Sequence, residues 1–165
     1  MPVTINASTS SGVVITPDYS GNIQLQYNGV AAPAFSAQMT TTSVSNTTWT
    51  KVLYGTENFD TNNNFTSSRF TPTVAGYYQI NANLRYADSI AGTVVQMAIY
   101  KNGNLYEYVS NGVQNVTRAL CVSTLLYCNG SSDYVEIYTY QNSGSSANTD
   151  AADYYTFSGC LLRGA

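Results

Sequence analysis

Apolar and polar residues alternate along most of this chain, which is the pattern of strands with one buried face. The clearest run is 77–86, where the even positions are apolar or aromatic and the odd positions are mostly polar. The same period of two recurs at 95–99, 120–126, 135–139 and 155–161. No segment has a sustained helical period. The chain is therefore predicted to be all-β, with short antiparallel strands.

Turn signals separate these runs. Asn102–Gly103 follows the run at 95–99 and precedes a return strand at 105–109, which predicts a hairpin. Asn129–Gly130 marks another turn, and 141–150 is a polar loop rich in Asn and Ser. Many short strands with regular turns favour a sandwich or jelly roll.

The first 32 residues differ from the rest. They contain short strand patterns, such as the alternating run 23–27, separated by turn signals such as Asn28–Gly29. A segment this short cannot build its own core. We therefore predict two parts: an amino-terminal attachment arm with short strands over residues 1–32, and a jelly-roll domain over residues 33–165.

Charge and hydropathy argue against two classes of function, nucleic-acid binding and membrane insertion. The 165 residues carry a net charge of −3, and the six basic residues are scattered, so no basic stripe can neutralise nucleic-acid phosphates. No apolar run of about 18 residues predicts a membrane span. The amino terminus lacks the pattern of a secretory signal. The chain is therefore expected to be made in a cytoplasm, without membrane insertion or nucleic-acid binding.

The residues for catalysis are largely missing. The chain has no histidine, which removes Ser-His-Asp and Cys-His nucleophiles and histidine metal sites. Asp60–Asn64 begins like a calcium loop, but Phe65 and Thr71 stand where an EF-hand needs Gly and Glu. We predict no enzyme activity, no catalytic residues, no cofactor and no metal site.

Three cysteines, an odd number, favour buried free thiols over a disulfide framework.

Several stretches after Pro33 resemble, in the right order, the complement component 1q globular head. They are Ala34-Phe35-Ser36-Ala37, the aromatic positions Phe59, Phe65 and Phe70, the strand Gly76-Tyr77-Tyr78-Gln79-Ile80, the turn Lys101-Asn102-Gly103 and the closing Tyr155-Thr156-Phe157-Ser158-Gly159-Cys160-Leu161-Leu162. That family and the related tumour necrosis factor superfamily are antiparallel jelly-roll sandwiches that assemble as tight trimers. The resemblance therefore implies this fold and a homotrimer.

A second resemblance concerns the arm. Residues 12–29 are similar to segments of bacteriophage tail and virion proteins that precede a distal domain. Together the two resemblances imply a non-enzymatic structural protein of the virion surface, made in the host bacterial cytoplasm. The expected role is a homotrimeric module of a tail or head fibre that mediates host attachment. Two alternatives stay open: a capsid decoration trimer that stabilises the head, and a soluble glycan-binding lectin-like protein.

The expected partners are other copies of the chain, virion proteins bound through residues 1–32, and a host-surface glycan. The residues expected in the trimer interface or core are Phe35, Tyr78, Ile80, Tyr86, Tyr155, Phe157 and Leu161. Receptor contacts are expected in the polar loops 61–68, 110–117 and 142–152, with Asn62, Asn63, Asn64, Asn142, Asn148 and Tyr154 as candidates.

Five tyrosines lie on strand faces opposite the predicted core. They are predicted either to pack in the trimer seam or to stack on sugar rings, and they are Tyr77, Tyr134, Tyr138, Tyr140 and Tyr154.

Overall fold

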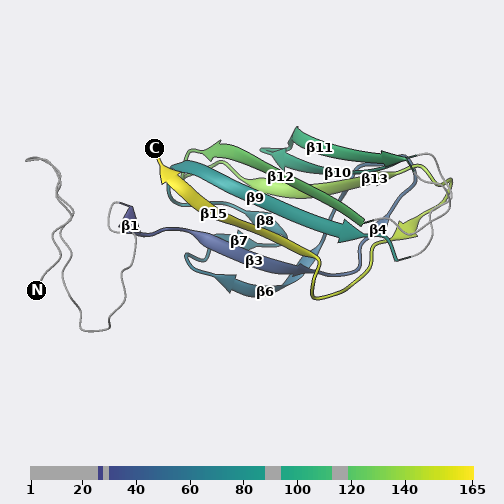
Figure 1. The fold of residues 1–165 in the computed structure, drawn as a ribbon, viewed down its shortest axis with the longest axis horizontal. Helices are drawn as coiled ribbons and strands as arrows, with labels where there is room; N and C mark the ends of the chain where they lie inside the picture. The colour runs from purple at the N-terminus through teal and green to yellow at the C-terminus, as the bar shows by residue number, and fades with distance from the viewer. Residues whose placement is uncertain (1–25, 28–29, 88–93, 113–118) are drawn as a thin grey trace, which may run out of the picture.

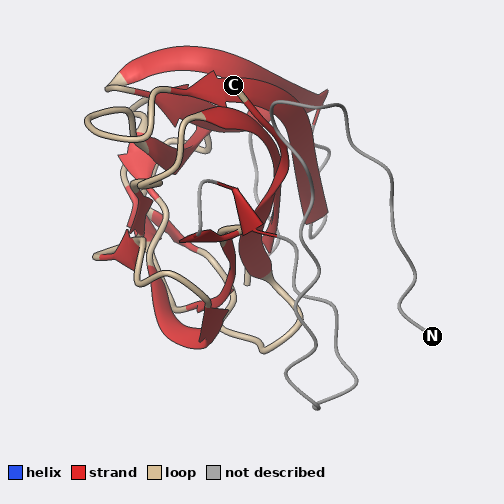
Figure 2. Cartoon of the chain, turned by 90° about the vertical axis from the view of Figure 1, so that its left-hand side faces the viewer, coloured by secondary structure: helices blue, strands red, loops and turns tan. Residues whose placement is uncertain are grey.

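The computed structural model describes residues 26–27, 30–87, 94–112 and 119–165. Over these ranges the chain forms strands and loops and contains no helix, and hence no helical membrane span. Two antiparallel sheets face each other around a common interior, as the two views in Figure 1 and Figure 2 show. The predicted all-β jelly-roll sandwich is therefore confirmed.

Both sheets place strands side by side that are far apart in the sequence. The β9 sheet has the order β12 (Ala119–Cys128), β9 (Gly76–Arg85), β15 (Thr156–Gly164), β3 (Ala34–Met39), β6 (Tyr54–Asp60). The β13 sheet has the order β11 (Asn104–Gly112), β10 (Val94–Lys101), β13 (Val135–Gln141), β8 (Arg69–Phe70), β7 (Phe65–Thr66), and β5 (Thr50–Lys51) also pairs with β13.

Two short pairs complete the fold. They are β1 (Gln26–Tyr27) with β2 (Val30–Ala31), and β4 (Ser43–Val44) with β14 (Ala147–Asn148). The β1–β2 pair closes directly across the predicted Asn28–Gly29 turn, because Tyr27 pairs with Val30. The other predictions for the arm fall on residues 1–25, outside the described residues.

Aromatic rings from both sheets meet in the core. Phe35 of β3 stacks on Phe65 and Phe70 of the β13 sheet, with ring centroids 5.0 and 4.3 Å apart. Phe157 of β15 meets the Phe35 ring edge-on at 4.8 Å. A Cβ atom at Gly159 would lie 2.9 Å from the Phe35 ring, closer than packed carbons allow. The glycine in the closing strand therefore makes room for this ring.

The alternation read from the sequence matches the burial of the strands. In β9 the side chains of Tyr78, Ile80 and Leu84 are fully buried, while their odd-numbered neighbours face outward. Phe35, Tyr78, Ile80, Tyr86, Tyr155 and Phe157 all lie in the core, and Leu161 packs partly buried against it. The first six side chains are thus used within the subunit.

The cysteines are free thiols in three different environments. Cys128 is buried, Cys160 is half-buried and Cys121 is exposed. The expectation of burial is wrong for Cys121, because it occupies an odd position of β12, whose even positions face the core.

The Tyr54 hydroxyl is buried and has no hydrogen-bond partner among the described residues. The Tyr86 hydroxyl, in the same core, lies 2.8 Å from Thr139 Oγ1. We expect Tyr54→Phe to raise the free energy of unfolding by roughly 1 kcal/mol, because it removes a desolvated polar group, and Tyr86→Phe to lower it by about as much. Urea unfolding of both variants checks this. Equal losses in the two variants would contradict it.

Candidate functional site

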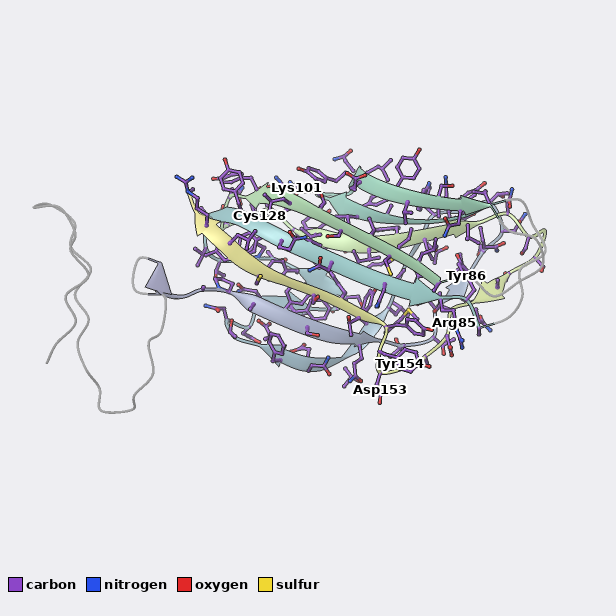
Figure 3. The ribbon with its side chains drawn as sticks, in the orientation of Figure 1. Arg85, Tyr86, Lys101, Cys128, Asp153 and Tyr154 are labelled. Carbon is purple, nitrogen blue, oxygen red and sulfur yellow. The ribbon has the colours of Figure 1, made fainter. Side chains whose placement is uncertain are left out.

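The two ends of the sandwich carry different features. β3 begins beside the middle of β15, since Ala34 pairs with Cys160, and from there β15 runs on to the end of the sandwich where Figure 1 shows β1 and the C terminus. We call it the arm end. The opposite end, here the distal end, carries the β4–β14 pair and the loop that follows β13. Figure 3 shows Lys101 and Cys128 toward the arm end and Arg85 and Tyr154 toward the distal end.

The loops at the distal end are braced by buried polar side chains. Gln141 is fully buried, and its amide nitrogen donates to the backbone oxygens of Val44, at 3.0 Å, and Ser145, at 2.8 Å. The Thr149 hydroxyl accepts from the backbone N–H of Thr42 at 2.9 Å. These bonds fix two loops that are about 100 residues apart in sequence. A loop that is already ordered loses less entropy when it binds a partner.

Tyr154 projects from this braced end. Its side chain is 67% exposed, and its ring meets Tyr155 edge-on at 4.8 Å. On the other side of Tyr155, Arg85 forms an ion pair with Asp150 and lies 5.9 Å from the Tyr155 ring centroid. The hydrogen bond to Asp150 raises the pKa of Arg85 above its ordinary value. The exposed Tyr154 ring therefore packs on Tyr155, which in turn neighbours the Arg85–Asp150 ion pair.

The predicted receptor-contact residues fall into two groups at opposite ends. Asn142, Asn148 and Tyr154 lie at the distal end. The loop with Asn62, Asn63 and Asn64 lies at the arm end, because the backbone N–H of Thr61 donates to the Ala34 oxygen at 3.0 Å.

Asn64 also faces inward. It is buried, and its amide nitrogen donates to the Thr73 hydroxyl at 3.2 Å, so its side chain stabilises the loop that carries it.

Most of the loop 110–117, the third predicted contact loop, lies outside the described residues.

Exposed apolar side chains gather where β11 and β12, the outer strands of the two sheets, contact each other. The Tyr106 hydroxyl of β11 donates to the Leu125 backbone oxygen of β12 at 3.5 Å, and Tyr77 meets Tyr127 edge-on at 5.5 Å. We call this surface the aromatic edge; its members are 40–51% exposed and are Tyr77, Leu105, Tyr106, Leu125 and Tyr127. A contiguous apolar patch of this kind is typical of a protein interface.

The outward face of the β9 sheet adjoins this edge, and its central part is polar without being charged. The Gln79 amide donates to the Ser123 hydroxyl at 2.9 Å, and that hydroxyl donates to Asn81 Oδ1 at 2.9 Å. A shallow pocket of about 190 Å³ opens among Asn81, Asn83, Cys121, Ser123 and Thr156. Beyond the aromatic edge, the outward positions over 34–38, 79–83, 119–123 and 156–162 carry no Asp, Glu, Lys or Arg. We call this surface the amide face.

A cluster of charges lies on the outward face of the β13 sheet. Glu136 is only 3% exposed, and its carboxylate accepts from Lys51 Nζ at 2.6 Å and Arg69 Nε at 2.9 Å. Burial alone raises the pKa of Glu136, but the hydrogen bonds from Lys51 and Arg69 outweigh burial and hold it below its ordinary value of 4.5. The sequence pattern does not indicate this cluster, because Lys51 and Arg69 are 85 and 67 positions away from Glu136.

The depressed pKa of Glu136 predicts acid sensitivity. The ion pairs stabilise the fold fully above the unfolded pKa of about 4.5 and lose this contribution as pH falls through the lower, folded pKa. We expect Glu136→Gln to be less stable than wild type at pH 7, with the gap closing under acid. Thermal unfolding between neutral pH and pH 3 measures the gap, with exposed Glu57→Gln as control. A gap that stays constant over that range would contradict the assignment.

Solved structures share this fold, while no protein-family model and no curated protein matches the chain. The globular domain of zebrafish complement 1qA superposes with a TM-score of 0.62 at 16% identity, covering 81% of this chain and 99% of that one. The Eiger TNF from S. frugiperda gives 0.63 at 8% identity, covering 81% and 94%. PRD1 vertex protein P5 gives 0.59 at 15% identity, covering 79% and 97%.

These likenesses define the class of the fold, a jelly roll of the complement 1q and tumour necrosis factor type. At these identities they establish the fold alone.

Proposed function

We propose that this protein is a non-enzymatic structural protein of the bacteriophage virion surface that assembles as a homotrimer and mediates attachment to the host. The observation that carries the proposal is the polarity of the domain: the chain from residues 1–32 enters at the arm end, and the braced loops lie at the distal end. Such polarity suits a module held at one end and free to make contacts at the other. The likeness to a phage vertex protein supports a virion location.

Self-association is proposed to place the aromatic edge of one copy on the amide face of the next. The two surfaces differ, so the contact is heterologous, and such a contact makes a ring when the rotation between copies closes after three subunits. The amide face carries no charge, and identical copies can approach it without repulsion. Three copies follow from the resemblance to trimeric jelly rolls. A trimer presents three distal ends at once, which turns weak contacts into useful avidity.

The arm, residues 1–32, is proposed to bind other virion proteins. Its β1–β2 pair is a two-stranded hairpin, which is at best marginally stable alone in water. Contact with a partner would stabilise this hairpin.

Binding of the purified protein to intact host cells tests attachment. We expect saturable binding that competes with phage adsorption. Tyr154→Ala and Asn148→Ala at the distal end should weaken it severalfold, and Asn63→Ala at the arm end, the matched control, should not. The absence of saturable binding by the folded trimer would reject attachment.

A capsid decoration trimer is the second candidate, favoured by the likeness to a vertex protein. It predicts binding to capsids that lack the protein and none to host cells. Measuring both interactions with one labelled preparation separates the two functions.

A further inference from the structure

The outward face of the β13 sheet carries aromatic rings that the proposed assembly does not use. Ala98 of β10 pairs with Tyr108 of β11 and with Tyr138 of β13, and Tyr138 pairs in turn with Lys51 of β5. Side chains at directly paired positions lie on the same face of a sheet. Rings from four neighbouring segments gather here, and we call them the aromatic platform: Trp49, Tyr100, Tyr108, Tyr138 and Tyr140.

Four of the five rings pack against one another. Tyr100 and Tyr138 are 4.3 Å apart between ring centroids, and Trp49 lies 6.0 Å from Tyr100 and 5.6 Å from Tyr140. Ala98 is 0% exposed although it points outward, since the large side chains around it close over its methyl group. Tyr108 is 52% exposed, and the other four rings are partly exposed.

A fixed polar cluster borders the rings. The Tyr138 hydroxyl donates to Glu136 Oε2 at 3.4 Å, which joins the platform to the Lys51–Glu136–Arg69 ion pairs. The Arg69 side chain is 42% exposed, and its guanidinium lies 3.9 Å from the ring centroid of Tyr134. Charged donors and a carboxylate acceptor are thus held in place beside exposed aromatic faces.

This chemistry differs from that of the aromatic edge. The edge includes exposed Leu105 and Leu125, and it adjoins an uncharged face, as an interface between protein chains requires. Tyr108 is the only member of the platform that is more than half exposed, and the platform has no aliphatic side chain. A buried ion cluster also adjoins it, whereas the centres of protein interfaces are depleted of charge. The platform therefore suits a ligand that has apolar faces and many hydroxyl groups.

We propose that the aromatic platform binds carbohydrate, with sugar rings stacked on the aromatic side chains and sugar hydroxyls bonded to the tyrosine hydroxyls and the Lys51–Glu136–Arg69 cluster. This inference rests on the proposed attachment function and names the class of ligand. The platform lies on the sheet opposite the amide face, so assembly leaves it open, and each trimer displays three copies.

The test is a glycan array of hexose, hexosamine and uronic acid oligosaccharides probed with the wild-type protein and with point variants. We expect binding to at least one glycan class. Tyr140→Ala and Tyr108→Ala should each weaken it roughly tenfold, because each removes a stacking ring, while Tyr140→Phe keeps most of it. Phe59→Ala, which removes an exposed ring from β6 of the opposite sheet, is the matched control and should bind the array as wild type does. Thermal unfolding and sedimentation confirm that each variant is folded and assembled.

Cell binding is measured in parallel, so that the two proposals fail separately. Wild-type protein that binds cells but no glycan would overturn the carbohydrate site and leave attachment standing. Glycan binding that survives in both Tyr140→Ala and Tyr108→Ala, or is lost in Phe59→Ala, would also overturn it. Glycan binding without cell binding would reject attachment and support the lectin-like activity alone.

Discussion

Phe157→Asp is expected to abolish folding. Phe157 is fully buried, and its ring contacts Phe35, Phe65 and Tyr54, which come from three other strands. A carboxylate at this position has no cation within the aromatic cluster and costs several kcal/mol, on top of the lost packing. Domains of this size are stable by only about 5–15 kcal/mol. Circular dichroism and the yield of soluble protein measure the outcome.

Leu162→Asp is the matched control, because it makes the same kind of change on the same strand at a side chain that is 59% exposed. It should fold with nearly wild-type stability. Normal trimers from Phe157→Asp would refute the inward orientation of the residue.

Leu125→Asp is expected to convert the trimer into folded monomers. Leu125 is 50% exposed in the isolated subunit and lies at the centre of the aromatic edge, beside Tyr106 and Tyr127. In the proposed seam it would lose its water, and an unpaired carboxylate there costs several kcal/mol at each of the three contacts. The strand itself should still pair, because the side chain faces outward.

Sedimentation equilibrium at micromolar concentration measures this effect as a threefold fall in particle mass with unchanged circular dichroism. Tyr154→Asp, equally outward but at the distal end, should remain trimeric. A wild-type protein that sediments as a monomer, or a Leu125→Asp variant that stays trimeric, would contradict the seam.

The long strands could be predicted because each has enough residues to show its period. Over β9 and β12 the even positions are buried along nearly the whole length, and only the exposed Cys121 departs from expectation. The segment 40–75 could not be predicted in this way. Its strands β5, β7 and β8 have two residues each, too few to alternate, and they exist because β13 and the core offer them partners.

The exposure of Phe59 could not be predicted from the sequence either. Its aromatic spacing matched the resemblance, yet it is 52% exposed because β6 is an outer strand and its pairing with β3 shifts register beside it. Alternation within a strand does not reveal which strands lie at the edge of a sheet.

The candidate surfaces depend on contacts between distant residues, which the sequence does not display. Glu136 lies between inward-facing Val135 and Ile137 and therefore reads as an exposed polar residue, but Lys51 and Arg69, 85 and 67 positions away, bury it. The polar loops were recognisable as loops. Their assignment to the arm end or the distal end follows from the strand order, which only the structure provides.

The uncharged amide face has a consequence for the medium in which the particle survives. Dissolved ions weaken an association by screening its Coulomb contacts, and the outward positions of this face offer none to screen. Subunits held through it should stay together from fresh water to brine. Sensitivity to salt and acid would then reside within each subunit rather than between subunits, in the Lys51–Glu136–Arg69 cluster and in the Arg85–Asp150 and Lys101–Asp133 ion pairs.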